Sequence, residues 1–315
     1  MISQRLDRTV AAVVLSIPAL LAAGALYDSR FLSPDYLLLQ LQVASFLGVI
    51  ATGLMPVVLL GHIDLSIPWV VTIGGMMATA ATEYATGSSG LPIYFALLCG
   101  LGVGLVNGVG VAYLRIPSMI FTLATNGIAQ GLMILHTSGF APQDGASPIM
   151  HFLAVQRSVA GIPNSLWVWA VLGGLTMALL TRTTFGRAVY AAGNNQRAAF
   201  LSRVNVNAVT VACFAISGAC SAFAGALLAG YSSKAYQAMG DPYLLPAIAA
   251  VVLGGTSISG GRGSYLGTVA GVIVMTLLQS ILSVAQLPES ARQMIHGAIL
   301  LAMLLVHAYG RKSAQ

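Results

Sequence analysis

The sequence predicts an all-α protein that crosses a membrane many times. Its 315 residues are 57% hydrophobic and only 7% charged, whereas soluble domains carry about 25% charged residues. Apolar runs of roughly 20 residues, the length that crosses a bilayer as a helix, recur from end to end between short polar interruptions. The net charge of +6 comes from basic residues between these runs. That is the pattern of topology signals, so we expect a lipid bilayer as partner and no nucleic acid.

Cutting the chain at its charged and turn-rich interruptions predicts about ten spans in one transmembrane domain of residues 1–315. The spans are expected near residues 10–27, 37–60, 67–82, 92–113, 116–138, 164–181, 207–230, 243–259, 264–285 and 293–309. The third and eighth runs are short for a complete crossing, which indicates broken or re-entrant helices.

The basic residues orient these spans. With the N-terminus in the cytoplasm, ten of the 14 Lys and Arg residues fall inside and four outside, as the positive-inside rule requires. The inside set is Arg5, Arg8, Arg115, Arg182, Arg187, Arg197, Arg203, Arg262, Arg311 and Lys312; the outside set is Arg30, Arg157, Lys234 and Arg292. An even number of spans then places the C-terminus in the cytoplasm as well.

The most basic interruption separates the sixth and seventh spans. Residues 182–206 carry four arginines beside a Gly-Asn-Asn turn. Asn194 or Asn195 can cap a short helix from Gln196 to Leu201, and Phe200 offers an apolar side chain at the cytoplasmic face. A loop that only sets topology needs arginines but no such turn. We therefore expect this segment to dock a cytoplasmic partner.

Small residues recur every fourth position within several spans. This spacing places them on one helix face, where two backbones can approach closely. The runs are Gly100, Gly104 and Gly108; Ser217, Ser221 and Gly225; and Gly267 with Gly271.

Two glycine-containing polar stretches interrupt the expected helices at the inner side, from Gly61 to Pro68 and from Gly254 to Thr268. Such stretches are typical of helices that unwind beside a polar cavity or turn at the membrane surface. Asp64 in the first stretch is a carboxylate at membrane depth, where insertion of a charge costs about 2.5–3.5 kcal/mol. Asp64 either caps the helix that begins near Ser66 or lines a transport path, and both roles can hold together.

The fifth span carries a polar stripe. Thr122, Asn126 and Gln130 are spaced four apart and share one helix face. Amides that face lipid lack partners, so this stripe should bond other helices or line a water-filled path. Asn107 in the fourth span is a weaker case of the same kind. The nominated path or gate residues are Asp64, Ser66, Asn107, Thr122, Asn126 and Gln130.

The sequence carries no signature of an enzyme. Its His, Cys and acidic residues show no metal-ligand spacing, and no Gly-x-x-x-x-Gly-Lys-Ser/Thr loop is present, so the chain cannot itself be a P-loop ATPase. We expect it to bind no cofactor. An ion-coupled secondary transporter of a small polar solute is the alternative hypothesis. Such proteins usually pair buried ionisable residues as relays, and Asp64 has no obvious acidic partner.

Four ordered stretches resemble the membrane-spanning permeases of ribose-type sugar ABC importers, a family that extends to autoinducer-uptake and branched-chain amino acid relatives. They are GHIDLSIP, IPSMIFTLATNGIAQGL, TTFGRAVYAAGNNQRAAFLS and LGGTSISGGRGSYLGT, and the similarity covers roughly residues 40–305. It implies a ten-helix subunit of the bacterial inner membrane that pairs with a second permease, identical or not. A periplasmic binding protein would deliver a sugar-like solute, and a separate cytoplasmic ATPase pair, which binds ATP and Mg²⁺, would drive alternating access.

The resemblance places the ATPase-coupling interface at Thr184–Ser202. The residues expected there are Phe185, Gly186, Arg187, Tyr190, Gly193, Asn194, Asn195, Arg197 and Phe200. The sequence departs from the family pattern at His62, Pro68 and Arg203, where glycine is usual. Since Pro68 suits the first turn of a helix, we expect a stiff start to the third span.

Overall fold

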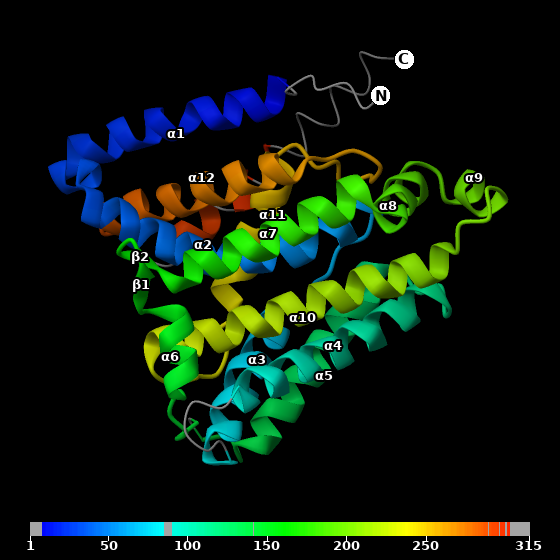
Figure 1. Cartoon of the computed structure of the whole chain (residues 1–315), viewed down its shortest axis with the longest axis horizontal. Helices are drawn as coiled ribbons and strands as arrows, with labels where there is room; N and C mark the ends of the chain where they lie inside the picture. The colour runs from blue at the N-terminus through cyan, green and yellow to red at the C-terminus, as the bar shows by residue number, and fades with distance from the viewer. Residues whose placement is uncertain are drawn as a thin grey trace.

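The chain folds into layers of helices that run broadly along one direction (Figure 1). The computed structural model describes residues 8–84, 90–140, 142–288, 290–295, 297–299 and 301–302. The helices are α1 (Arg8–Tyr27), α2 (Pro34–Leu59), α3 (Ile67–Ala80), α4 (Leu91–Ala112), α5 (Ser118–His136), α6 (Pro148–Ala154), α7 (Asn164–Arg182), α8 (Thr184–Asn194), α9 (Gln196–Leu201), α10 (Val206–Ser232), α11 (Leu244–Leu253) and α12 (Tyr265–Val284). Three 3-10 helices, η1 (Ser29–Leu32), η2 (Ala81–Tyr84) and η3 (Asp241–Tyr243), and the antiparallel strands β1 (Arg157–Val159) and β2 (Ile162–Pro163) complete the set.

Seven helices of the described residues are long and apolar enough to cross a membrane: α1, α2, α4, α5, α7, α10 and α12. The third and eighth predicted spans correspond to α3 and α11, which have only 14 and 10 residues. Both are too short to cross a bilayer as straight helices, as predicted. The expected end of the eighth span at residue 259 is wrong. Gly254 and Gly255 leave the helix there, and Gly255 has φ +88.

The expected tenth span at 293–309 lies only partly within the described residues, which are helical at 290–295, 297–299 and 301–302. Arg5, Arg311 and Lys312, three of the predicted cytoplasmic cations, lie outside the described residues.

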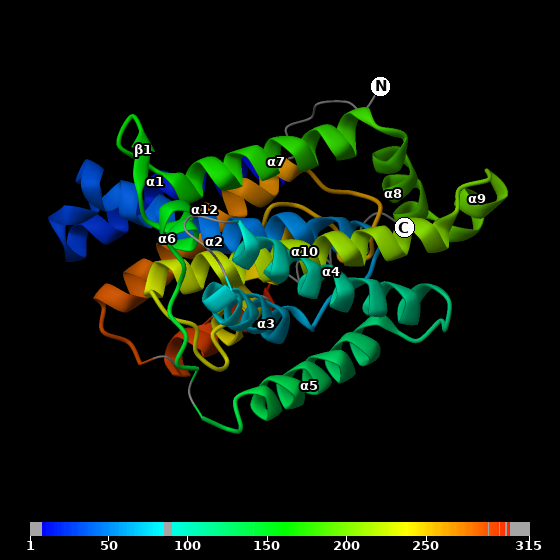
Figure 2. The same cartoon turned by 60° about the horizontal axis from the view of Figure 1, so that its bottom comes forward.

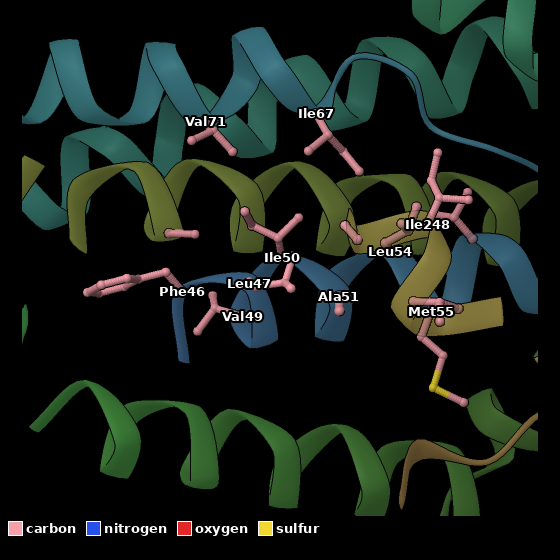
Figure 3. Close-up of a cluster of buried hydrophobic side chains, with 14 of the residues drawn as sticks. Phe46, Leu47, Val49, Ile50, Ala51, Leu54, Met55, Ile67, Val71 and Ile248 are labelled. Atoms are coloured by element: carbon pink, nitrogen blue, oxygen red, sulfur yellow. The ribbon is translucent and has the colours of Figure 1, made fainter. Parts of the chain in front are cut away.

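Helix α2 forms the centre of the molecule. Every residue from Ala44 to Leu59 is buried, because a helix that is apolar on all sides is most stable when neighbours cover it completely. Figure 3 shows side chains of this helix in one cluster with Ile67 and Val71 of α3 and Ile248 of α11.

Helix α10 packs beside α2 and also contacts α3 and α4. The contacts of α10 with α3 and α4 are close because small residues lie on the facing sides of these helices, as predicted. A Cβ atom on Gly104 of α4 would overlap the carbonyl oxygen of Phe214 in α10, and one on Gly225 would overlap the carbonyl oxygen of Val71 in α3. Gly271 of α12 makes the same kind of approach to α11. The prediction of close helix packing at these glycines is confirmed.

The connections between helices gather at two opposite ends. Helices α8 and α9 mark one end, and α6 with β1 and β2 marks the other (Figure 1). Loops 60–66, 113–117 and 254–264 share the α8–α9 end, as the contacts described below show. At the other end a backbone bridge joins Gly145 to Lys234. The short elements α6, β1 and β2 have no counterpart among the predicted spans.

Helix α5 lies at the edge of the molecule, apart from the central helices (Figure 2). Only Ser118, Thr122, Ala129 and Met133 of this helix are buried. Its exposed side chains include seven large apolar ones, Met119, Ile120, Leu123, Ile128, Leu132, Ile134 and Leu135, beside the polar Gln130 and His136. A lone helix with so much apolar surface is suited to lipid or to another subunit.

Candidate functional site

A buried carboxylate lies at the centre of the irregular segment between α2 and α3. Asp64 is 1% exposed. Its Oδ1 accepts hydrogen bonds from the backbone N–H of Ser66 at 3.0 Å and from Ser66 Oγ at 2.6 Å. Its Oδ2 accepts a bond from Ser217 Oγ of α10 at 2.8 Å. Asn107 Nδ2 of α4 donates to Ser66 Oγ at 2.8 Å, so α4, α10 and the loop meet at this cluster, directly ahead of α3.

The geometry is that of a modified helix cap. Helix α3 begins at Ile67 with Pro68 in its first turn, as predicted, and Ser66 makes no side-chain cap of its own. Asp64 instead binds the N–H of Ser66, directly ahead of the helix, where negative charge is favoured by the helix dipole. The amide oxygen of Asn107, Oδ1, is buried and has no hydrogen-bond partner among the described residues.

Ser217 was not among the nominated site residues. Its spacing with Ser221 and Gly225 predicts only a face for helix packing. Nothing in the sequence indicates that its hydroxyl binds Asp64. The bond to Asp64 arises because close packing of α10 brings this hydroxyl against the unwound segment.

The polar face of α5 supports the same segment. Three of its side chains, four residues apart, each accept a hydrogen bond from a backbone N–H group near the start of α3. The bonds are Ile63 N to Ser118 Oγ at 3.3 Å, Leu65 N to Thr122 Oγ1 at 2.9 Å and Trp69 N to Asn126 Oδ1 at 3.3 Å. An unwound segment has lost its own helical acceptors, so these side chains replace them. Gln130, one turn further along, is exposed and does not take part in this set.

The segment from Thr183 to Leu201 forms two short helices, each started by a side-chain cap. Thr183 Oγ1 accepts a bond from the N–H of Gly186 at 3.2 Å and begins α8. Asn195 Oδ1 accepts a bond from the N–H of Ala198 at 3.0 Å and begins α9. Of the two predicted caps for the short helix, Asn195 is therefore the one that is formed.

The nine residues predicted for the coupling interface divide into two groups. The exposed group is Arg187, Asn194, Asn195, Arg197 and Phe200. The packed group is Phe185, Gly186, Tyr190 and Gly193. Phe200 of α9 is 72% exposed, which leaves its ring free to contact another protein.

A cavity of about 920 Å³ opens beside α9. It lies between this helix, the α4–α5 loop and the start of α10, and its walls include His62, Arg115, Arg197 and Phe200. No acidic residue is among the described residues that line it. Burial lowers the pKa of His62, which leaves this side chain neutral at pH 7, so the positive charge comes from the two arginines.

Comparison with known proteins gives a consistent family. Residues 36–304 match the family described as branched-chain amino acid transport system / permease component. The ribose import permease protein RbsC of Haemophilus influenzae is 32% identical over 301 residues, which cover 94% of this chain and 92% of that protein. The L-arabinose ABC transporter permease protein AraH of Azospirillum brasilense is 34% identical over 304 residues (95% and 87%). The autoinducer 2 import system permease protein LsrC of Escherichia coli is 31% identical over 294 residues (93% and 84%).

Proposed function

The chain belongs to the family of branched-chain amino acid transport system permease components, and from this premise we propose that it is the membrane-spanning subunit of a binding-protein-dependent ABC importer. The match over residues 36–304 carries the proposal, because it includes both unwound stretches and the coupling segment. The proposed substrate is a sugar or sugar-like small molecule, since the relatives are named for import of ribose, L-arabinose and autoinducer 2. The family does not favour an ion-coupled secondary transporter.

The proposed topology has ten spans with both termini in the cytoplasm of a bacterial inner membrane. It is supported by the position of the connections, because the loops predicted to be cytoplasmic share the α8–α9 end. Arg115 and Arg197 line one cavity at this end, as the positive-inside rule would place them.

The proposed docking surface for the ATPase subunit is the exposed face of α8 and α9. Phe200 and Arg197 are exposed next to the basic cavity, so a partner with an apolar groove flanked by acidic residues would fit this face. ATP and Mg²⁺ would bind to that partner, and this chain would supply the attachment. The binding protein would dock at the opposite end, near α6.

The proposed path lies between two permease subunits, identical or not, along α5. The exposed apolar surface of α5 needs cover, and Gln130 adds a polar group on the exposed side. Asp64, Ser66, Asn107, Thr122 and Asn126 would then shape the path from behind rather than line it directly, since four of them are buried. The buried four are Asp64, Ser66, Asn107 and Thr122.

Transport by alternating access follows from this arrangement. ATP binding would draw the two ATPases together, move the attached α8–α9 segments and open the path outward to the loaded binding protein. Hydrolysis would reset the path inward and release the solute to the cytoplasm.

Uptake of radiolabelled D-ribose and L-arabinose tests the proposal in cells that express the chain with its ATPase and binding protein and that lack the proton-driven ATP synthase. Depletion of ATP by arsenate should stop uptake, whereas a protonophore should leave it intact. The double variant Arg197→Glu with Phe200→Glu should abolish uptake and co-purification of the ATPase. Arg157→Glu, an exposed change at the opposite end, is the matched control for co-purification and should keep the ATPase bound. Uptake that is lost with the protonophore and survives arsenate would overturn the proposal.

A further inference from the structure

Three segments that are far apart in the sequence touch through their backbones at the α8–α9 end. They are the end of α2, the end of α8 and the loop 254–264. The N–H of Gly261 donates a hydrogen bond to the carbonyl oxygen of Leu59 at 2.8 Å. A Cβ atom on Gly193 would overlap that same oxygen and lie 2.7 Å from the nitrogen of Gly261. A Cβ atom on Gly260 would lie 2.8 Å from the carbonyl oxygen of Gly193. We call this contact the glycine junction (Leu59, Gly61, Gly193, Gly260 and Gly261).

The junction requires glycine for two reasons. Gly260 and Gly261 have φ values of +84 and +77, which side chains rarely adopt. A side chain at Gly193, Gly260 or Gly261 would also push the backbones apart, because its Cβ atom would lie within 2.8 Å of a backbone atom of a neighbouring segment. The three segments are therefore held at a separation that no other residue permits.

Tyr190 adds a side-chain bond across the same contact. It lies on the packed face of α8, and its hydroxyl donates to the carbonyl oxygen of Gly263 at 3.0 Å. The packed residues of α8 are thus tied to loop 254–264, while the side chains of Arg187 and Asn194 remain exposed.

The junction continues directly into the segment that carries the buried carboxylate. Gly61 belongs to the junction, since a Cβ atom on it would lie 3.2 Å from the carbonyl oxygen of Ser259, and it lies three residues before Asp64. Residues 63 to 69 are in turn bound to the polar face of α5. A continuous chain of contacts therefore runs from α8 through the junction to α5.

Backbone contacts of this kind transmit displacement well. Side chains can absorb a movement of about 1 Å by changing rotamer, but two backbones in van der Waals contact cannot, because protein interiors are close-packed. A shift of α8 must therefore move loop 254–264 and the end of α2 with it.

We propose that the glycine junction, with Tyr190 as its positioning residue, transmits the movement of the ATPase-docked α8 to the unwound segment and to α5. This inference rests on the proposed function and goes beyond it, because it assigns the route inside the chain. The packed group of coupling residues transmits the movement, and the exposed group receives it.

The test uses the assembled complex of permease, ATPase and binding protein in nanodiscs. Cys99, Cys213 and Cys220 are replaced by alanine, and Gly131→Cys on α5, an exposed position where a Cβ atom meets nothing within 4 Å, is the reporter. The rate of its reaction with a water-soluble fluorescent maleimide is measured without nucleotide and after trapping with ATP, Mg²⁺ and vanadate. The amount of trapped nucleotide is measured in the same samples.

Trapping should change the labelling rate in the reporter chain. Tyr190→Phe should reduce this change by about fivefold, the effect on an equilibrium constant of losing one neutral hydrogen bond. Gly261→Ala should abolish the change. Both variants should trap as much nucleotide as the reporter chain. Tyr113→Phe, an exposed tyrosine, and Gly174→Ala, where a Cβ atom meets nothing within 4 Å, should keep the full change.

Other results would overturn either this inference or the proposed function. If Tyr190→Phe and Gly261→Ala trap nucleotide and keep the full change in labelling, the junction does not transmit and the inference is overturned. If the variants fail to trap nucleotide, the junction serves docking instead, which also overturns it. If Gly261→Ala does not fold, Tyr190→Phe still decides, because it keeps the ring and removes one oxygen. If the unaltered chain itself traps no nucleotide in the same assembled complex, the proposed function fails.

Discussion

Removal of the Asp64 carboxylate should destabilise the protein far more than its replacement by an amide. The carboxylate accepts three hydrogen bonds, two from Ser66 and one from Ser217, and it is almost completely buried. In Asp64→Ala these donors lose their acceptor together. The two serine hydroxyls can turn to other acceptors, such as a carbonyl oxygen one helical turn back. The N–H of Ser66 cannot turn.

The expected magnitude follows from that count. A buried N–H group without an acceptor costs about 1–3 kcal/mol, and the space left by the carboxylate costs about 1 kcal/mol more. We expect the free energy of unfolding of Asp64→Ala to fall by about 3 kcal/mol. Asp64→Asn keeps an oxygen for both bonds from Ser66, and its NH₂ group can donate to the hydroxyl of Ser217. The fall in that variant should be about 1 kcal/mol or less.

The measurement is SDS-induced unfolding in mixed micelles, followed by far-UV circular dichroism. Asp35→Ala, an exposed acidic residue in the first turn of α2, is the control and should unfold near the wild-type midpoint. A free energy of unfolding for Asp64→Ala within 1 kcal/mol of wild type, the lower limit expected for an orphaned N–H, would refute the reasoning. The same variants separate the two roles of Asp64. Stable Asp64→Asn protein with normal sugar uptake indicates a capping role, whereas stable protein without uptake indicates that the path needs the charge.

Two further predictions concern backbone geometry. Arg203 has φ +62, a conformation that glycine adopts without strain, so Arg203→Gly should raise the free energy of unfolding by about 0.5–1 kcal/mol. Arg197→Gly within α9 should lower it, and equal effects of the two variants would contradict the explanation. Gly104→Ala should destabilise by about 1–3 kcal/mol because its Cβ atom would overlap the backbone of α10. Gly102→Ala, where a Cβ atom meets nothing within 4 Å, should be neutral or stabilising in the same SDS titration.

The membrane helices were predictable because one physical requirement determines them. A backbone in lipid must satisfy its own hydrogen bonds, so each long apolar run has to be a helix, and α1, α2, α4, α5, α7, α10 and α12 lie close to the predicted limits. Elements outside lipid do not follow this rule. Helix α6 has seven residues, which is too short to show an apolar run, and it is held by tertiary contacts such as Gln42 Nε2 to the carbonyl oxygen of Ala154 at 2.8 Å.

The candidate site was predictable in its residues but not in its contacts. Asp64 stood out because a carboxylate in an apolar stretch is costly, and Asn195 because a cap is a local pattern. The bond from Ser217 and the junction of Gly193 with Gly261 depend on how distant segments pack. The positions of these residues in the sequence do not predict that packing. Ser118 could have been predicted from the sequence, since it lies four residues before Thr122 and extends the same polar stripe.

The hydrogen bonds between α5 and the unwound segment limit how the path can open. Separation of the two would leave the N–H groups of Ile63, Leu65 and Trp69 without acceptors, at about 1–3 kcal/mol for each buried group. Three such losses together approach the whole stability of a typical domain, which is 5–15 kcal/mol. Helix α5 and residues 63–69 should therefore move as one body, so opening has to occur on the exposed side of α5 and not between α5 and α3.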